Sequence, residues 1–501
     1  MTAAPGGLHP VQVRHRGPGR YVPAVSLHHA VQLLADPGLQ PARIIAGGTD
    51  LLLEIERGVR RGVATLIDIS AVPGAGSITV TDGDARLGPM VTHNDVVGSA
   101  ALVMQALPLA QACWEVGSAQ LRNRATVAGN LLTASPANDT ISALLALGAT
   151  AELHSARGLR RVPVEAFFTG FRTTVAEPDE LLSAIEVPLL GAGQRGIFVK
   201  LANRAAQAIS VLHLAVVVGL DEDGVVRSAR IALGSVAATV VLAPAAAEVL
   251  VGRTLDAEAI DDAAAAAAAS VSPIDDIRAT AEYRRRTLPV ALRRALHTLA
   301  ADRQRERWPV HPPMLSSGHT IPTSTSSASD ASANATDATA TVFDAGTVVT
   351  ATVNGKRRAA AGAVGATLLE WLRDELAVLG PKEGCAEGEC GACTVSLDGA
   401  AVMACLVPAA RAHGSEVTTV EGLAEDGDGG LHRLQQAFVD CAAVQCGFCT
   451  PGLLVAGAQL LAEIPRPSKE QLQQGLAGNL CRCTGYTSII AAMQQAAGAD
   501  Q

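Results

Sequence analysis

Short apolar runs separated by polar turns fill the first 300 residues and predict a mixed α/β region. Residues 42–46 (ARIIA) have the character of a buried strand. Gly47-Gly48 is expected to form a turn that leads into a helix starting over residues 51–58. Residues 66–69 (LIDI) have strand character. Three further segments have helical character: residues 141–149, 257–270 and 283–307.

The last 150 or so residues change to hairpins followed by helices. Residues 348–357 alternate and turn at Asn354-Gly355, a pair that tolerates positive φ, and residues 394–402 turn at Asp398-Gly399. Ser468 and Gln471 form a capping box, and Pro451 is expected at the first position of its helix. Helical periodicity marks residues 367–377, 431–443, 451–463, 468–476 and 487–498. We therefore expect a β-rich unit followed by an all-α unit.

A polar segment separates the two regions. Residues 312–341 are mostly Ser, Thr, Ala, Pro, Asn and Asp, and they contain no aromatic residue. Such a segment buries too little apolar surface to offset its ordering entropy. About thirty flexible residues reach roughly 30 Å end to end, so the segment is expected to act as a linker that does not dictate how domains dock.

Composition excludes several classes of protein. The length of 501 residues leaves room for about three domains. Hydrophobic residues make up 49% and charged residues 17%, which rules out global disorder. Aromatics make up only 3% and the net charge is −9, so no nucleic acid is expected as a partner. The arginines of residues 283–307 are better interpreted as a solvated helix face than as a docking surface.

The chain also lacks the features of an exported or membrane protein. Pro5, Gly6 and Gly7 interrupt the N-terminus, which has no apolar core of a signal peptide. No apolar run reaches the ~18 residues that span a bilayer. We therefore expect a cytoplasmic protein with no membrane span.

Cysteine placement is the strongest chemical signal. Nine of the ten cysteines crowd between Cys385 and Cys483, and Cys113 stands alone before them. Because cytosolic thiols are kept reduced, this clustering favours metal binding over disulfides. Cys113 and Cys441 are most simply buried small hydrophobic residues.

Four cysteines, which we call the first cysteine set, follow the spacing C-x4-C-x2-C-x11-C: Cys385, Cys390, Cys393 and Cys405. The first three have the spacing of a plant-type [2Fe–2S] loop. Bridging sulfides need backbone N–H donors, and Gly384, Gly388, Gly391 and Ala392 let the chain wrap closely around them. Structural zinc is the alternative, but its sites usually present two matched C-x2-C pairs.

Four more cysteines, the second cysteine set, form a C-x2-C and a distant C-x-C: Cys446, Cys449, Cys481 and Cys483. Both pairs precede predicted helices, whose N-termini stabilise an anionic cluster. Zinc or a redox disulfide remains an alternative for this pattern alone. A plant-type loop in the same small region makes a second [2Fe–2S] cluster the better interpretation.

Two polar loops stand out in the N-terminal half. Residues 46–51 (AGGTDL) place two glycines between a strand and a helix, where a pyrophosphate could approach the backbone. A simple tight turn is the alternative, and the absence of G-x-G-x-x-G leaves a Rossmann domain unsupported. Residues 120–139 are dense in amides and hydroxyls, and taken alone they favour a polar loop with no ligand.

Together these motifs resemble a known family. GCAEGECGACTV and QCGFCTPG…GNLCRCTGY resemble, over residues 347–501, the iron–sulfur subunit of the molybdenum hydroxylases, which include xanthine dehydrogenase, aldehyde oxidase and carbon monoxide dehydrogenase. The AGGTDL and TVAGN loops resemble the flavin-binding subunit of the same family over about residues 10–300.

The resemblance implies an α+β multidomain fold. An FAD-binding domain of the vanillyl-alcohol-oxidase/PCMH type is expected first, with an α+β C-terminal subdomain. A plant-type ferredoxin β-grasp domain and a helical-bundle [2Fe–2S] domain are expected after the linker. The expected boundaries of these domains and the linker are 1–182, 183–304, 305–346, 347–425 and 426–501.

The resemblance also implies site residues. Ala128 stands where the family usually has Gly, and segment 273–285 (PIDDIRATAEYRR) matches the family in character. Gln445 and Cys483 are expected to approach the pterin of a partner chain. All eight cysteines of the two sets are expected to be cluster ligands. The expected FAD-binding residues are Ala46, Gly47, Gly48, Thr49, Asp50, Leu51, Ala125, Thr126, Gly129, Asn130, Asp139 and Lys200.

The implied function is electron transfer by a molybdenum hydroxylase subunit. The molybdopterin subunit of the family is too large for this chain, and no catalytic constellation of its own is evident. A partner would hydroxylate the substrate. Electrons would pass through two [2Fe–2S] clusters to FAD and on to NAD, a quinone, oxygen or another acceptor, in a dimer of heteromers. The alternatives are a self-sufficient reductase that uses NAD(P)H and a zinc-stabilised assembly module.

Overall fold

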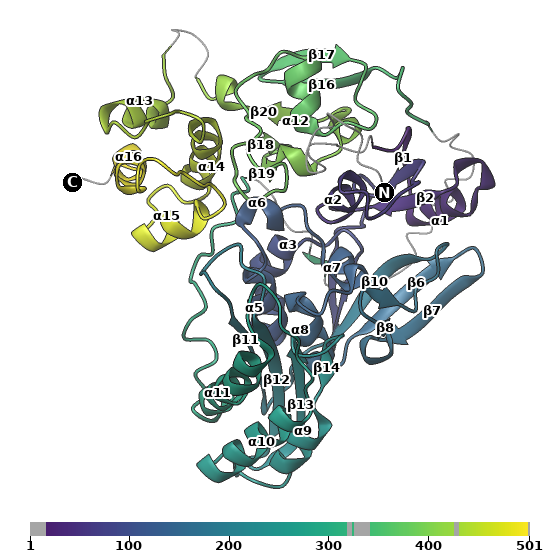
Figure 1. Cartoon of the computed structure of the whole chain (residues 1–501), viewed down its shortest axis with the longest axis vertical. Helices are drawn as coiled ribbons and strands as arrows, with labels where there is room; N and C mark the ends of the chain where they lie inside the picture. Colours follow the sequence, from purple (N-terminus) through teal and green to yellow (C-terminus); the bar gives the residue numbers. More distant parts are fainter. Residues whose placement is uncertain (1–16, 318–322, 325–340, 425–429, 499–501) are drawn as a thin grey trace, which may run out of the picture. The chain divides into compact units, whose positions relative to one another are not determined.

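The computed structural model describes residues 17–317, 323–324, 341–424 and 430–498 (Figure 1). These residues form two compact units. The first unit contains the described residues up to Val72, a short stretch from Leu315, and the described residues from 341 onward. The second contains Pro73–Met314 and the pair 323–324.

The first unit opens with a small parallel sheet. Its strand order is β1-β3-β2, from β1 (Arg20–Pro23), β2 (Ala42–Ile45) and β3 (Thr65–Asp68). Helix α1 (Leu27–Ala35) precedes β2, and α2 (Leu51–Glu56) follows it. The strands predicted over 42–46 and 66–69 and the helix predicted from residue 51 are confirmed.

A five-stranded sheet, ordered β17-β16-β20-β18-β19, follows in the first unit. Both predicted hairpins are confirmed, and Asn354 and Asp398 take φ of 52° and 50° at their turns. The helix predicted over 367–377 is shorter and less regular: α12 (Leu368–Glu370) runs into a π-helical turn over Trp371–Glu375. The strands are β16 (Val349–Val353), β17 (Lys356–Ala360), β18 (Thr394–Leu397), β19 (Ala400–Met403) and β20 (Glu416–Thr418).

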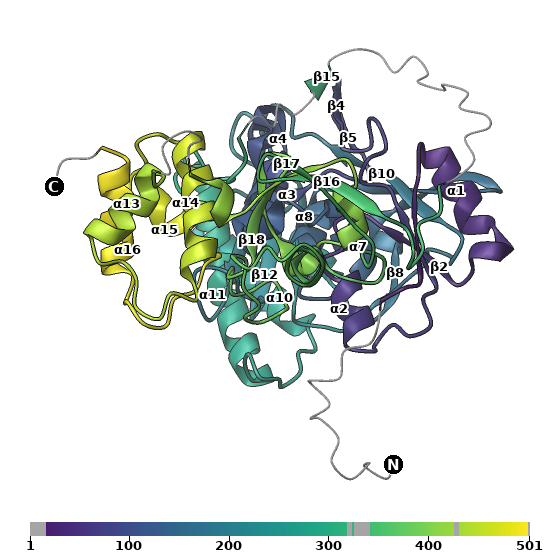
Figure 2. The same cartoon turned by 90° about the horizontal axis from the view of Figure 1, so that it is seen from above.

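Four helices end the first unit and gather together in Figure 2. They are α13 (Arg433–Asp440), α14 (Thr450–Glu463), α15 (Lys469–Gly475) and α16 (Thr487–Ala496). The predicted capping box of Ser468 and Gln471 is present at α15. Pro451 lies at the second position of α14 rather than the first, because the helix begins at Thr450.

The second unit contains a six-stranded sheet ordered β15-β4-β5-β10-β6-β7. Its strands are β4 (Ile78–Thr81), β5 (Asp84–Leu87), β6 (Thr150–Ser155), β7 (Gly158–Pro163), β10 (Leu181–Pro188) and β15 (Thr323–Ser324). A short hairpin pairs β8 (Phe168–Gly170) with β9 (Thr173–Thr174). The helices of this part are α3 (His93–Gly98), α4 (Ala100–Gln105), α5 (Leu107–Trp114), α6 (Ala119–Arg122), α7 (Val127–Thr133) and α8 (Asp139–Leu147). Helix α8 confirms the helix predicted over 141–149.

A four-stranded antiparallel sheet completes the second unit (Figure 1). Its central strand β12 (Leu212–Leu220) is buried on both faces. Leu214, Val216 and Val218 pack into one core with the C-terminal helices of the unit, and Ala215 and Val217 pack into the other core, which includes α8. The other strands are β11 (Gln194–Leu201), β13 (Val226–Gly234) and β14 (Val241–Leu242), and the helices are α9 (Pro244–Leu250), α10 (Ala257–Ala269) and α11 (Ala281–Ala300).

Helix α10 confirms the prediction over 257–270, whereas α11 ends at Ala300 and not at residue 307. Residues 318–322 and 325–340, which make up most of the predicted linker, lie outside the described residues. Within the described ranges, no helix is both long enough and apolar enough to cross a membrane.

Candidate metal and cofactor sites

The first cysteine set lies on one loop and one strand end of the β-grasp sheet. Cys393 directly precedes β18, and Cys405 follows β19 in a short 3-10 turn. Because β18 and β19 are antiparallel, with Thr394 opposite Met403, the two cysteines come side by side. Their Sγ atoms are 3.4 Å apart, and both residues are at least 95% buried.

The loop before Cys393 curls around the Cys385 sulfur. The backbone N–H groups of Glu387, Glu389 and Cys390 donate to Cys385 Sγ at 3.3, 3.3 and 3.4 Å. The Cys390 thiol and these backbone donors outweigh burial and lower the pKa of Cys385 to about 5. The loop is therefore built to hold a thiolate and to offer N–H groups to a negatively charged centre.

The second cysteine set lies between the helices of the C-terminal bundle. Cys446 and Cys483 are exposed, and their Sγ atoms are 3.6 Å apart. Cys449 is the N-cap residue of α14, and its sulfur pairs with that of Cys481. The C-x-C pair is not directly at a helix start, because α16 begins only at Thr487.

The sulfurs of both sets come together in pairs, an arrangement that a [2Fe–2S] cluster requires. Two thiolates on one tetrahedral metal with ~2.3 Å bonds lie about 3.8 Å apart, close to the spacings seen here. In a [2Fe–2S] cluster each iron takes two protein ligands. The cluster therefore requires two pairs of sulfurs, and the four sulfurs do not converge on one point. In the described part of the chain, no three His, Cys, Asp or Glu side chains converge to hold one ion. All ten cysteines are free thiols.

The AGGTDL loop connects β2 to α2 in the first unit. Gly48 has φ of 82°, which suits glycine, and a Cβ there would lie 3.2 Å from Ile45 Cδ1. Asp50 is the N-cap residue of α2, but its side chain makes no capping bond. Because α2 has only six residues, its dipole is weak, and a phosphate bound at this loop would be held mainly by backbone N–H groups.

A contact within the first unit connects this loop to the first cysteine set. A Cβ at Gly48 would lie 3.5 Å from the carbonyl oxygen of Leu406, the residue after Cys405. At the end of α2, Arg57 donates to the Glu387 carboxylate on the cysteine loop. The chain segment expected to bind flavin phosphate thus packs directly on the chain segment expected to bind iron.

The TVAGN loop lies in the second unit, at the start of α7. Thr126 caps this helix by accepting the Gly129 N–H at 2.9 Å, and both Thr126 and Ala125 are buried. The Asn130 carbonyl accepts a bond of 2.7 Å from the Asn138 side chain, which ties the loop to residues 135–139. Ala128 is 4% exposed, and its methyl group packs in the core. The methyl group therefore leaves the outer side of the loop unobstructed.

Asp139 and Lys200 contact each other. Lys200 Nζ donates to Asp139 Oδ2 at 2.7 Å, and the two side chains are only 3% and 7% exposed. Ser210 donates to the other oxygen of Asp139. The sequence suggested neither Ser210 nor His213, whose ring contacts Ser142 Oγ and the Pro136 carbonyl at 2.9 and 3.2 Å. Asp139 and Lys200 therefore form a buried ion pair that fixes the 135–139 loop.

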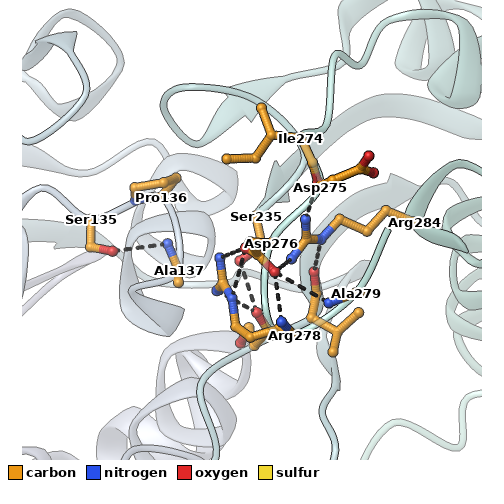
Figure 3. Close-up of polar contacts among 12 residues, drawn as sticks. Ser135, Pro136, Ala137, Ser235, Ile274, Asp275, Asp276, Arg278, Ala279 and Arg284 are labelled. Atoms are coloured by element: carbon orange, nitrogen blue, oxygen red, sulfur yellow. Dashed lines mark hydrogen bonds and ion pairs between the residues drawn. The ribbon is translucent and has the colours of Figure 1, made fainter. Parts of the chain in front are cut away.

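Segment 273–285 reinforces the same region (Figure 3). Asp276 accepts bonds from Arg278 and from the fully buried Arg284. Burial opposes ionisation of Asp276, but these donors outweigh it and lower its pKa. Arg278 also donates to the Ser210 carbonyl at 2.8 Å, and Ser235 N–H donates to the Pro136 carbonyl at 2.8 Å.

Gln445 belongs to a stretch of exposed residues around Cys446. It is exposed, directly before Cys446. Four partly exposed apolar side chains flank Cys446 and Cys483 in the sequence, and we call them the apolar rim: Val444, Phe448, Leu480 and Tyr486, at 42, 47, 50 and 38% exposed. The second cysteine set is therefore accessible from outside the chain, whereas Cys393 and Cys405 are not.

Comparison with sequence families gives four matches along the chain. Residues 14–190 match the FAD binding domain in molybdopterin dehydrogenase, and residues 197–299 match the CO dehydrogenase flavoprotein C-terminal domain. Residues 351–419 match a 2Fe-2S iron-sulfur cluster binding domain, and residues 419–494 match a [2Fe-2S] binding domain.

Relatives align with less than a third of the chain. The nicotine 6-hydroxylase small subunit of Paenarthrobacter nicotinovorans is 48% identical over 146 residues, which cover 29% of this chain and 87% of the relative. The nicotinate dehydrogenase small FeS subunit of Eubacterium barkeri is 45% identical over 144 residues, which cover 29% of this chain and 90% of the relative.

Solved structures align with more than half of the chain. Carbon monoxide dehydrogenase from Hydrogenophaga pseudoflava, in a form that lacks the Mo-pyranopterin moiety, has a TM-score of 0.55 and 31% identity. The match covers 58% of this chain and 100% of that chain. Quinoline 2-oxidoreductase from Pseudomonas putida 86 has a TM-score of 0.53 and 28% identity, over 57% of this chain and 97% of that chain.

Proposed function

Since this chain belongs to the molybdenum hydroxylase family and joins its flavin-binding and [2Fe–2S] domains in one polypeptide, we propose that it carries electrons from a separate molybdopterin-bearing chain to an external acceptor. The clusters pass single electrons, and bound FAD supplies the exchange between one-electron and two-electron chemistry. NAD, a quinone, oxygen or another acceptor receives the electrons in this proposal, and the assembly is a dimer of heteromers.

One observation carries the proposal: the graded exposure of the sites in the first unit. The second cysteine set opens to the surface through the exposed Cys446 and Cys483. The first set has no exposed member: two of its cysteines are buried and two are partly buried. Leu406 beside the first set packs on Gly48 of the loop expected to hold FAD. This order supports electron entry at the second set and exit toward the flavin.

The apolar rim supports a protein donor at the entry point. Exposed apolar side chains around a reactive centre are typical of a surface that another chain covers. Gln445 and Cys483 lie at this surface and are proposed to face the pterin of the partner. Asp139 and Lys200 hold the 135–139 loop in place, so their contribution to FAD binding is proposed to be indirect.

Substitution of one exposed ligand tests the route. In the native complex, Cys446→Ser should abolish flavin reduction by the partner's substrate while FAD stays bound. Its iron content should fall from about four to about two per chain, because each cluster needs four ligands. Cys441→Ser is the matched control, because Cys441 lies in the same domain and bonds to Gln495 outside the set.

The outcomes separate the proposal from its alternatives. Unchanged flavin reduction in Cys446→Ser would contradict the route. Flavin reduction by NAD(P)H with no molybdenum-bearing companion in the purified native complex would favour a self-sufficient reductase. A colourless protein that contains zinc would favour an assembly module.

A further inference from the structure

The two cysteine sets approach each other through a backbone contact. The N–H group of Leu480 donates to the carbonyl oxygen of Cys390 at 2.9 Å. Cys390 belongs to the first set, and Leu480 directly precedes Cys481 of the second. A single hydrogen bond therefore joins main-chain segments that carry proposed ligands of different clusters.

Glycines make this contact possible. Gly391 has φ of 70°, and a Cβ there would lie 2.3 Å from the Gly478 carbonyl oxygen. A Cβ at Gly452, in the first turn of α14, would lie 2.0 Å from the Gly391 carbonyl oxygen. Any side chain at either position would force the two loops apart.

Asn479 joins the loops from the helical side. Its side chain is 2% exposed, and Nδ2 donates to the Gly391 carbonyl at 3.0 Å and contacts Thr394 Oγ1 at 3.3 Å. Thr394 in turn donates its own hydroxyl to the Gly391 carbonyl at 2.7 Å. A buried amide bonded in this way fixes the distance between the loops, because breaking the bonds would leave polar groups unpaired.

We propose that Asn479 is a positioning residue that holds the Cys390–Leu480 hydrogen bond and so sets the electronic coupling between the two clusters. The inference rests on the proposed function. Electron tunnelling weakens exponentially with the length of the path, and a hydrogen bond conducts better than a gap between nonbonded atoms. The step moves one electron: one ferrous iron of the second set becomes ferric while one ferric iron of the first set becomes ferrous. No bond forms or breaks and no proton moves.

The test uses the full chain with both clusters and compares Asn479→Ala with Asn354→Ala. Asn354 is a matched control, because its amide also joins two segments of the β-grasp domain, through Thr419 at 2.9 and 2.8 Å, away from the contact between the clusters. Low-temperature electron paramagnetic resonance after full reduction by dithionite measures the magnetic coupling between the clusters. Freeze-quench spectra after mixing with limiting dithionite measure how fast an electron redistributes between them.

For Asn479→Ala we expect weaker magnetic coupling and several-fold slower redistribution, with full iron content and unchanged midpoint potentials. Asn354→Ala should match the wild type. Wild-type coupling and rate in Asn479→Ala would overturn the proposal, and so would a change confined to the midpoint potentials.

A second variant decides the question if Asn479→Ala loses iron. Thr394→Val keeps Asn479 but removes one of its partners and one bond to Gly391, so it should reduce the coupling in the same direction. Wild-type coupling in that variant would overturn the positioning role. Failure of the wild-type chain itself to pass electrons between its clusters would instead contradict the proposed function, and with it the step that Asn479 serves.

Discussion

Single glycines determine how closely this chain can approach a cofactor. Gly48 and Gly62 both take left-handed φ, 82° and 77°. They differ in surroundings, because a Cβ at Gly48 would press on Ile45 and lie near Leu406, whereas a Cβ at Gly62 would have nothing within 4 Å. The two positions therefore separate the cost of backbone strain from the cost of lost space.

We predict that Gly48→Ala weakens FAD binding several-fold and that Gly62→Ala does not. Gly62→Ala should lower the free energy of unfolding by about 1 kcal/mol, because an L residue is strained in the left-handed region. Gly48→Ala should lower it further, because its Cβ would also press on Ile45. Titration of FAD into the apoprotein, followed by flavin fluorescence, measures the difference. Equal affinities in the two variants would argue against a phosphate contact at the AGGTDL loop.

His93 is a buried group that should control stability in acid. Burial, and then the charge of Arg122, lower the pKa of His93 from 6.5 to about 3. Its Nδ1 contacts Cys113 Sγ at 3.4 Å, and its Nε2 has no hydrogen-bond partner among the described residues. The folded chain therefore keeps His93 neutral where the unfolded chain would protonate it.

This difference in protonation makes the folded chain less stable as the pH falls. Between pH 6.5 and about 3 the unfolded state binds the extra proton, so falling pH removes stability that is fully present above 6.5, by as much as about 5 kcal/mol. His93→Phe should flatten this acid limb, and the exposed His297→Gln should not. Urea denaturation at a series of pH values measures both slopes, and equal slopes in His93→Phe and the wild type would refute the prediction.

Spacing along the chain indicated which cysteines lie together better than which polar residues of the flavin region do. Cysteine spacing is local, and it grouped the cysteines into two sets, within each of which sulfurs lie close together. The pairing of Cys393 with Cys405 depends on strand register, which spacing does not contain. The Asp139–Lys200 ion pair joins residues 61 positions apart, and only the fold shows that each side chain is the ion-pair partner of the other.

Among the elements, α11 holds the loop before it through one buried cation. Arg284 donates to the Val211 carbonyl and to Asp276, both at 2.8 Å, and its side chain is fully buried. Arg286 lies on the same helix but is exposed. The buried arginine connects α11, the residue before β12 and segment 273–279 in one network.

We predict that Arg284→Ala lowers the free energy of unfolding by about 3–5 kcal/mol, because it removes a buried donor from Asp276 and from the carbonyls of Val211 and Ile274. Arg286→Ala should change it by less than about 0.5 kcal/mol, as expected of a surface position. Urea denaturation provides both values. Similar small losses in both variants would show that the network contributes little to folding.

Hydrophobic patterns predicted some fully buried elements, such as α8 and β3, but missed others. Asn354-Gly355 and Asp398-Gly399 identified both hairpins, because their positive φ has a clear sequence signature. Strand β12 is buried on both faces, so its apolar run has no alternation and gave no indication of strand or helix. The sequence also did not indicate the π-helical turn at Trp371, since the hydrophobic periodicity there is that of an ordinary helix.

At the scale of the whole molecule, the two ends of the chain share one unit. Phe343, just before the β-grasp domain, exchanges both backbone hydrogen bonds with Tyr21 of β1 at 2.9 and 2.8 Å. Phe343 and Tyr21 are both buried. The iron–sulfur part is thereby attached to the sheet that carries the AGGTDL loop, a pairing that no linear pattern indicates.

The apolar rim remains the surface on which a partner is expected. Phe448 is the larger of the two rim side chains that flank Cys446 in the sequence. We predict that Phe448→Ser weakens association with the molybdopterin-bearing chain by about thirtyfold, since a central aromatic side chain at an interface typically contributes about 2 kcal/mol. Leu159→Ser is the matched control, because Leu159 is 61% exposed on β7 of the second unit. Calorimetric titration of the purified chains measures both affinities, and iron analysis verifies that the clusters are intact. If Phe448→Ser bound as tightly as Leu159→Ser, the partner would dock elsewhere, and electron entry at Cys446 and Cys483 would have to be abandoned.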